Sequence, residues 1–185
     1  MLKTLSNWLV KNTRGWLILV FLALDVLFMA VLLPGTQAKI EAVSGGTGPI
    51  DLQFFYTPAK VYGMIESYGD EIRAAYRVTE LTTDIIYPII YTLAYSMLIT
   101  WLFQRGFGKD SYMQRLNVMP FGAWLFDLLE NLGIVTMLTI YPSQPAALAW
   151  VATIFTSIKW FFAFVSIALV LVGVLAAVVG IFRKK

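Results

Sequence analysis

The stretch VMPFGAWLFDLLENLGIVTMLTIY, residues 118–141, decides the fold that we expect for this chain. It contains 24 residues, and three strongly polar side chains interrupt its apolar run: Asp127, Glu130 and Asn131. Because a helix needs about 20 apolar residues to cross the hydrocarbon core of a bilayer, the stretch predicts a transmembrane helix. Residues three and four apart share a helical face, so the three polar side chains are expected on one face.

Three further apolar segments predict three more transmembrane helices. Residues 16–34 carry one charge, Asp25, and end at the pair Pro34-Gly35, which is typical of a helix stop. Residues 84–103 and 146–182 are the other two segments. The sequence therefore predicts an all-α, integral membrane four-helix bundle that forms a single domain, with an outer loop over residues 35–83.

The fourth apolar segment is too long for a single crossing. Residues 145–182 form a run of 38 residues, which at about 1.5 Å per residue would span nearly twice the hydrocarbon core. The basic residues 183–185 anchor its end, so its membrane part is expected at about residues 160–182. Residues 146–158 would then stand above the membrane or pack on the outer loop, and a kink is the alternative.

The positions of lysine and arginine predict the orientation. Nine of them precede the first span, separate the second from the third, or follow the fourth: Lys3, Lys11, Arg14, Arg105, Lys109, Arg115, Arg183, Lys184 and Lys185. The loop 35–83 instead carries six acids against four basic residues. Both termini are therefore predicted on the cytoplasmic side of a plasma (inner) membrane, and the loop 35–83 is predicted outside.

The N-terminal residues 1–13 place apolar side chains at helical spacing between lysines, which predicts a short helix lying on the inner surface. A frayed terminus is the plainer alternative. The basic start followed by an apolar run also leaves open a signal peptide in the first 34 residues. The apolar run is longer than a usual signal sequence and contains Asp25, so we expect it to be retained.

The outer loop is predicted to be partly helical. Thr57 can cap a helix that has Pro58 at its first position, and Gly69 is a typical stop, so a helix is expected over residues 58–68. A second helix is expected to begin near Glu71 and to run without a break into the second span. A passive linker is the alternative.

The composition excludes several kinds of chemistry. The chain has no cysteine and no histidine, which removes disulfides, thiol catalysis and the usual ligands of zinc and haem. We find no phosphate loop, dinucleotide fingerprint or hydrolase motif. No catalytic residue, metal or cofactor is therefore predicted. The basic inner loops follow the positive-inside pattern and call for no nucleic acid.

Polar side chains from all four spans are expected to meet at similar depth. A charge at the bilayer centre costs about 2.5–3.5 kcal/mol, so such residues usually face the bundle interior or a wet cavity. In the second span Pro88 also leaves the backbone carbonyl of Asp84 without its helical donor, so this carbonyl needs another partner. The candidate ligand- or ion-binding residues are Asp127, Glu130, Asn131, Asp84, Tyr87, Tyr91, Asp25 and Lys159.

These residues also allow a purely structural interpretation. Buried carboxyl groups can hold helices together through hydrogen bonds, and Lys159 can extend to the headgroups. The tyrosines Tyr87 and Tyr91 can be interface aromatics. Several carboxylates facing a single lysine nevertheless predict that at least one of them is protonated or shares a proton.

Three functions remain open from the sequence. The first is binding or handling of a small hydrophobic or cationic ligand, a cation or a proton in an outward-facing cavity within the lipid bilayer. The second is an accessory subunit of a larger membrane complex, and either role is compatible with a homo-oligomer. The third is an intramembrane enzyme that acts on lipid, with paired carboxylates as acid and base.

The layout of four helices with acidic residues in the middle spans is similar in outline to the sterol isomerase and sigma-2 receptor group. The isomerases use a histidine, which this chain lacks. The resemblance is one of layout, so no residue role is transferred from it.

Overall fold

The computed structural model describes residues 2–46 and 48–183, and this part of the chain is helical without any strand. Four of its helical segments are long and apolar enough to cross a membrane. The all-α prediction is therefore confirmed. In chain order the elements are α1 (Leu2–Asn12), α2 (Gly15–Leu27), the π-helical turn η1 (Phe28–Leu32), α3 (Leu33–Val43), α4 (Pro58–Leu81), α5 (Thr83–Gly106), the 3₁₀ helix η2 (Tyr112–Val118), α6 (Met119–Ile140) and α7 (Ala146–Arg183).

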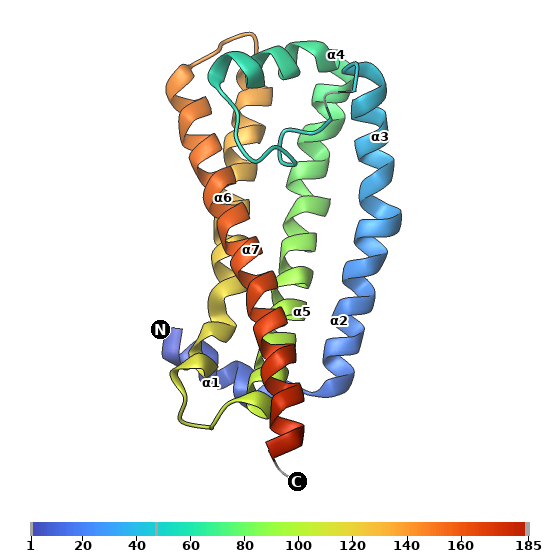
Figure 1. The fold of residues 1–185 in the computed structure, drawn as a ribbon. Helices are drawn as coiled ribbons and strands as arrows, with labels where there is room; N and C mark the ends of the chain where they lie inside the picture. The colour runs from blue at the N-terminus through green and yellow to red at the C-terminus, as the bar shows by residue number, and fades with distance from the viewer. Residues whose placement is uncertain (1, 47, 184–185) are drawn as a thin grey trace.

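The helices α5, α6 and α7 form the body of the molecule (Figure 1). The long helix α7 packs on α6 at one end and crosses onto α5 at the other, where both termini of the chain lie. Gly106 permits this crossing, because a Cβ atom there would lie 2.5 Å from the Cβ of Ala176. Gly133 permits a similar close approach between α6 and α7, because a Cβ atom there would lie 2.9 Å from the Cβ of Ala152. Small residues at such crossings let helix backbones approach closely.

The first long helix continues beyond its predicted end. α2 passes through the turn η1 into α3 and ends at Val43, so the prediction that Pro34-Gly35 stops it is wrong. In η1 the Leu33 amide bonds the Phe28 carbonyl, five residues back, and Pro34 follows in the first turn of α3. A helix that has already widened at this point tolerates a residue that has no amide hydrogen.

This first long helix, which comprises α2, η1 and α3 and is called the first helix below, stands at the side of the body, as Figure 1 shows. α2 packs on α5, and α3 packs on α4. Within α2 only Ile18 and Asp25 are buried. The helix is therefore attached along a narrow strip, and most of its apolar side chains point outward.

α4 lies across the end of the body opposite the termini (Figure 1). Its Thr57 cap accepts a hydrogen bond from the Lys60 amide, and a left-handed residue, Gly69, with φ of 68°, bends it. Glycine adopts this conformation without the clash that a Cβ atom would bring. Helical structure resumes after the bend and runs to Leu81. The predicted unbroken passage into α5 is wrong, because Thr82 has a non-helical conformation.

Residues 48–57, which we call the strap, enter the body beneath α4. Ile50 and Tyr56 are fully buried there. The first turns of α7 hold the strap: the Tyr56 amide donates to the Thr153 hydroxyl at 3.0 Å, and the Ser157 hydroxyl donates to the Phe54 carbonyl at 3.1 Å. Of the two arrangements expected for residues 146–158, the structure has the one packed on the outer loop, and α7 runs unbroken.

The N-terminal helix α1 packs on η2 at the opposite end. Leu9 is fully buried in this contact, and the Ser6 hydroxyl donates to the Gln114 carbonyl at 3.3 Å. Residues 2–12 are thus an ordered part of the fold, rather than a frayed terminus.

Candidate functional site

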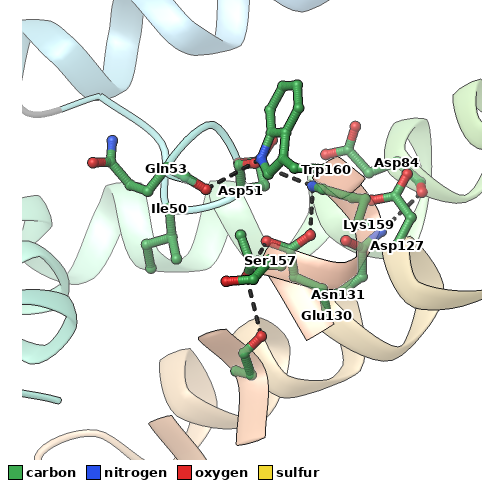
Figure 2. A network of polar contacts seen from close by, with 12 residues as sticks. Ile50, Asp51, Gln53, Asp84, Asp127, Glu130, Asn131, Ser157, Lys159 and Trp160 are labelled. Atoms are coloured by element: carbon green, nitrogen blue, oxygen red, sulfur yellow. Dashed lines mark hydrogen bonds and ion pairs between the residues drawn. The ribbon is translucent and has the colours of Figure 1, made fainter. Parts of the chain in front are cut away.

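Lys159 of α7 is the centre of a buried polar network (Figure 2). Only 9% of this residue is exposed. Its ammonium forms an ion pair with Glu130, lies 3.4 Å from Asp127 Oδ1, and donates to the backbone carbonyl of Asp51 at 3.1 Å. Lys159 therefore points into the body, and the alternative in which it extends to the surface is wrong. A buried ammonium of this kind requires partners on every side.

Hydroxyl groups complete the contacts of the two α6 carboxylates. The Thr156 hydroxyl donates to Glu130 Oε1 at 2.7 Å, and the Tyr91 hydroxyl donates to Asp127 Oδ2 at 2.9 Å. Each carboxylate therefore interacts with an ammonium on one oxygen and a hydroxyl on the other. The network joins α5, α6, α7 and the strap.

Asn131 of α6 bonds the backbone of α5 at the point where Pro88 interrupts it. Its side-chain amide donates to the Asp84 carbonyl at 2.9 Å. This is the carbonyl that lacks a helical donor because proline has no amide hydrogen. The sequence indicated that this carbonyl needs a partner, and the structure identifies the partner.

Side chains of α4 and α7 anchor the strap above this network. The Tyr76 hydroxyl accepts from the Ile50 amide at 3.0 Å and donates to the Asp51 carboxylate. From α7 the Trp160 indole donates to the Gln53 carbonyl at 3.2 Å. Within the strap, burial raises the pKa of the Tyr56 hydroxyl well above its ordinary value, so this group remains a hydroxyl at neutral pH.

A cavity of about 390 Å³ lies next to the network, between the first helix, α5, α6 and α7. This volume is within the range of about 300–1,000 Å³ that is usual for small-molecule sites. Its wall near the strap is polar and includes Asp84, Asp127 and Lys159. Its wall nearer the termini is largely apolar and includes Ala123 and Ala163. The charged side chains of the wall therefore lie at the strap end, and the end nearer the termini, which also includes Tyr95 and Ser166, has none.

The structure brings most of the predicted site residues to this cavity. Six of the eight line it: Asp84, Tyr87, Tyr91, Asp127, Asn131 and Lys159. Glu130 is fully buried behind Lys159 and has 0% exposure. Asp25 is buried on α2, apart from the lysine, where its carboxyl interacts with the Tyr87 hydroxyl. Predicted residues of α5, α6 and α7 thus lie together, Asp25 of the first span does not reach Lys159, and the ligand-binding role stays a prediction.

Two acidic residues near the network were not among the predicted site residues. Glu80 is completely buried, and neither of its carboxylate oxygens has a hydrogen-bond partner among the described residues. In the sequence it lies four residues before Asp84, a spacing that shares a face in an unbroken helix, although Thr82 interrupts the helix between the two residues. Asp51 belongs to the strap, and nothing in its local sequence distinguishes it from an ordinary loop acid.

The cavity wall contains more hydrogen-bond acceptors than free hydrogen-bond donors. Among the described residues, Asp84 makes no side-chain hydrogen bond or ion pair, although it lines the cavity. Lys159, the cation in this wall, is already bonded to two carboxylates and a carbonyl. In the same part of the chain, no group of three or more carboxylates has an arrangement that fits a metal ion. The geometry suits a ligand that brings its own positive charge or donors.

Comparisons with known proteins do not assign the site. No family model, no curated protein and no solved structure matches this chain. The similarity in outline to the sterol isomerase and sigma-2 receptor group therefore gains nothing from them, and function has to be argued from the geometry above.

Proposed function

We propose that this chain is an integral membrane protein that binds a small, positively charged ligand in its cavity, within the outer half of the bilayer. The observation that carries the proposal is the cavity wall, in which the carboxylates Asp84 and Asp127 face one lysine that is already paired. A bound cation would compensate the charge of such buried carboxylates, which protonation of one of them would otherwise remove.

Membrane insertion is supported by the outward faces of the long helices. Apolar side chains such as Leu19, Phe161 and Leu171 are each more than half exposed. A soluble protein rarely leaves contiguous apolar surface of this extent in water. Lipid would cover these faces, and the buried polar network would be shielded within the bundle.

The distribution of charge supports an orientation with both termini in the cytoplasm. The termini and the loop between α5 and α6 lie at one end of the molecule (Figure 1), and the described residues at that end include seven lysines and arginines: Lys3, Lys11, Arg14, Arg105, Lys109, Arg115 and Arg183. Positive residues accumulate on the cytoplasmic side of membrane proteins. In this orientation the strap and α4 face outside, and the cavity lies beneath them.

Binding of a short alkyl ammonium ion tests the proposal. The protein is reconstituted in phosphatidylcholine nanodiscs and titrated calorimetrically with butylammonium, and with butanol as the uncharged counterpart. We expect saturable binding of butylammonium and none of butanol. The substitutions Asp84→Asn and Asp127→Asn should each weaken binding about tenfold or more, because each removes a negative charge from the wall.

The matched control is Asp110→Asn, the same substitution in an exposed loop at the other end of the molecule. It should bind like the wild type. The proposal fails if wild-type nanodiscs bind no butylammonium, or if both cavity variants bind it unchanged.

A second candidate, an accessory subunit of a membrane complex, is favoured by an aromatic patch on the outside of the strap end. Phe54 and Phe55 are more than half exposed, and Phe55 packs beside the exposed Trp150. Large exposed aromatics are common at contacts with partner proteins. Native purification in mild detergent would show stoichiometric partners that are lost on Phe54→Ser and Phe55→Ser substitution. A chain that purifies alone would exclude this role.

A further inference from the structure

The cavity has an opening on the side of the molecule, between the first helix and α7. Met29 lies on one edge of this opening and Ile167 on the other. Both line the cavity, yet they are 58% and 48% exposed on the surface. Two such residues on facing helices mark a mouth between them. Figure 1 shows the first helix standing apart from α7 along this side.

The strap covers the cavity at its other accessible end. Pro49, Asp51 and Leu52 line the cavity from above, and bonds from α4 and α7 hold this part of the strap. The route along the helix axes from outside is therefore roofed by an anchored segment. The lateral mouth requires no movement of the strap.

The cavity is elongated along the helices. On α5 its wall runs from Asp84 to Tyr95, a distance of roughly 16 Å at about 1.5 Å per helical residue. Its unpaired carboxyl group, that of Asp84, lies at the strap end, and the mouth between Met29 and Ile167 is apolar. An occupant that matches both parts has a cationic group at one end and a hydrocarbon chain at the other.

We propose that the ligand is a single-chain amphiphile with an ammonium head, which enters sideways from the outer leaflet between η1 and α7. Its head would lie between Asp84 and Asp127, and its chain would pass Met29 and Ile167 toward lipid. The ring faces of the neighbouring tyrosines add attraction for an ammonium group. This inference rests on the proposed function, because it assumes that the cavity binds a cation within a bilayer.

The test uses a dodecylammonium probe that carries a nitroxide near the end of its chain, in phosphatidylcholine nanodiscs. Electron paramagnetic resonance separates probe held by protein from probe moving freely in lipid, so partition into the bilayer alone gives no signal of binding. We expect an immobilised component that Asp84→Asn reduces about tenfold or more. A chain-labelled dodecanoate should show no such component, because its head repeats the charge of the wall.

The substitution Ile167→Trp tests the mouth, since the larger ring would fill the space that the chain needs. We expect it to lower dodecylammonium binding about tenfold. The control is Leu171→Trp, one helical turn further along α7, where the side chain is 61% exposed and off the cavity. Ile167→Ala, which opens the mouth, should retain binding.

The outcomes separate this inference from the proposed function. If butylammonium binds and the long probe is not immobilised, or Ile167→Trp leaves the long probe unaffected, the lateral route is overturned and the head site stands. If dodecanoate is held as well as dodecylammonium, the ammonium class is overturned. If neither amine binds, the proposed function fails and this inference fails with it.

Discussion

The side-chain amide of Asn131 donates a hydrogen bond of 2.9 Å to the backbone carbonyl of Asp84. This carbonyl would otherwise bond the amide of residue 88, but residue 88 is proline. The bond joins α6 to α5 directly beside the cavity. It therefore fixes the position of a cavity-lining acid through the backbone, and leaves the acid's own side chain free.

A first prediction concerns this bond. Asn131→Ala leaves the Asp84 carbonyl without a donor in a buried region, which should cost about 1–3 kcal/mol of stability. Pro88→Ala restores an amide hydrogen that can bond the same carbonyl within α5. The double variant Pro88→Ala/Asn131→Ala should therefore lose less stability than Asn131→Ala alone. Unfolding of the detergent-solubilised protein by sodium dodecyl sulfate measures each variant.

Additive losses in that double-mutant cycle would show that the two residues act independently. The loss on Asn131→Ala would then not arise from the Asp84 carbonyl that Pro88 leaves without a helical donor.

A second prediction concerns the buried ion pair. Lys159→Met removes the ammonium that Glu130 and Asp127 share, so two buried carboxylates lose their cation. Breaking a buried pair in this way typically costs about 3–5 kcal/mol. Adding Glu130→Gln and Asp127→Asn to Lys159→Met should recover much of the loss, because no unpaired charge then remains. Thermal unfolding in detergent compares the three proteins.

The surface pair of Arg73 with the exposed Asp70 supplies the contrast. Asp70→Asn should change stability by less than about 1 kcal/mol, because water screens an exposed pair. An equal loss for Asp70→Asn and Lys159→Met would argue against a special role for the buried network.

A third prediction concerns the crossing of α5 and α7. Gly106→Ala places a methyl group 2.5 Å from the Cβ of Ala176 and 2.6 Å from its backbone carbon, so the helices must separate. Overpacking of this kind costs about 1–3 kcal/mol. Gly63→Ala is the matched control, since nothing lies within 4 Å of its added methyl group. It should be neutral or slightly stabilising, because alanine favours helix over glycine. Unfolding in sodium dodecyl sulfate ranks both against the wild type.

Much of the fold could be predicted from apolar length alone. The runs around α6 and α7 exceed the length of a bilayer crossing and have clear ends at proline or basic residues. The end of the first helix could not be predicted. The pair Pro34-Gly35 is a stop by composition, and only the preceding π-helical turn makes it acceptable inside a helix.

The candidate site likewise has a part that could be predicted from the sequence and a part that could not. The helical spacing of Asp127, Glu130 and Asn131 sufficed to place them on one buried face, because period and depth are local properties. The contribution of Asp51 depends on how the strap enters the body, which is a long-range property. Its carbonyl bonds Lys159, 108 residues away in the sequence, and no local pattern predicts such a contact.

The π-helical turn Phe28–Leu32 determines which side chains of the first helix face α5. In a regular α-helix, positions spaced by four residues rotate about 40° further round the axis at each step. The wider turn offsets this rotation, so the series Asp25, Met29, Leu33 and Gln37 keeps one azimuth along the helix. Deleting one residue from this turn would rotate α3 relative to α2, and Leu33 and Gln37 would leave the cavity wall that they now line.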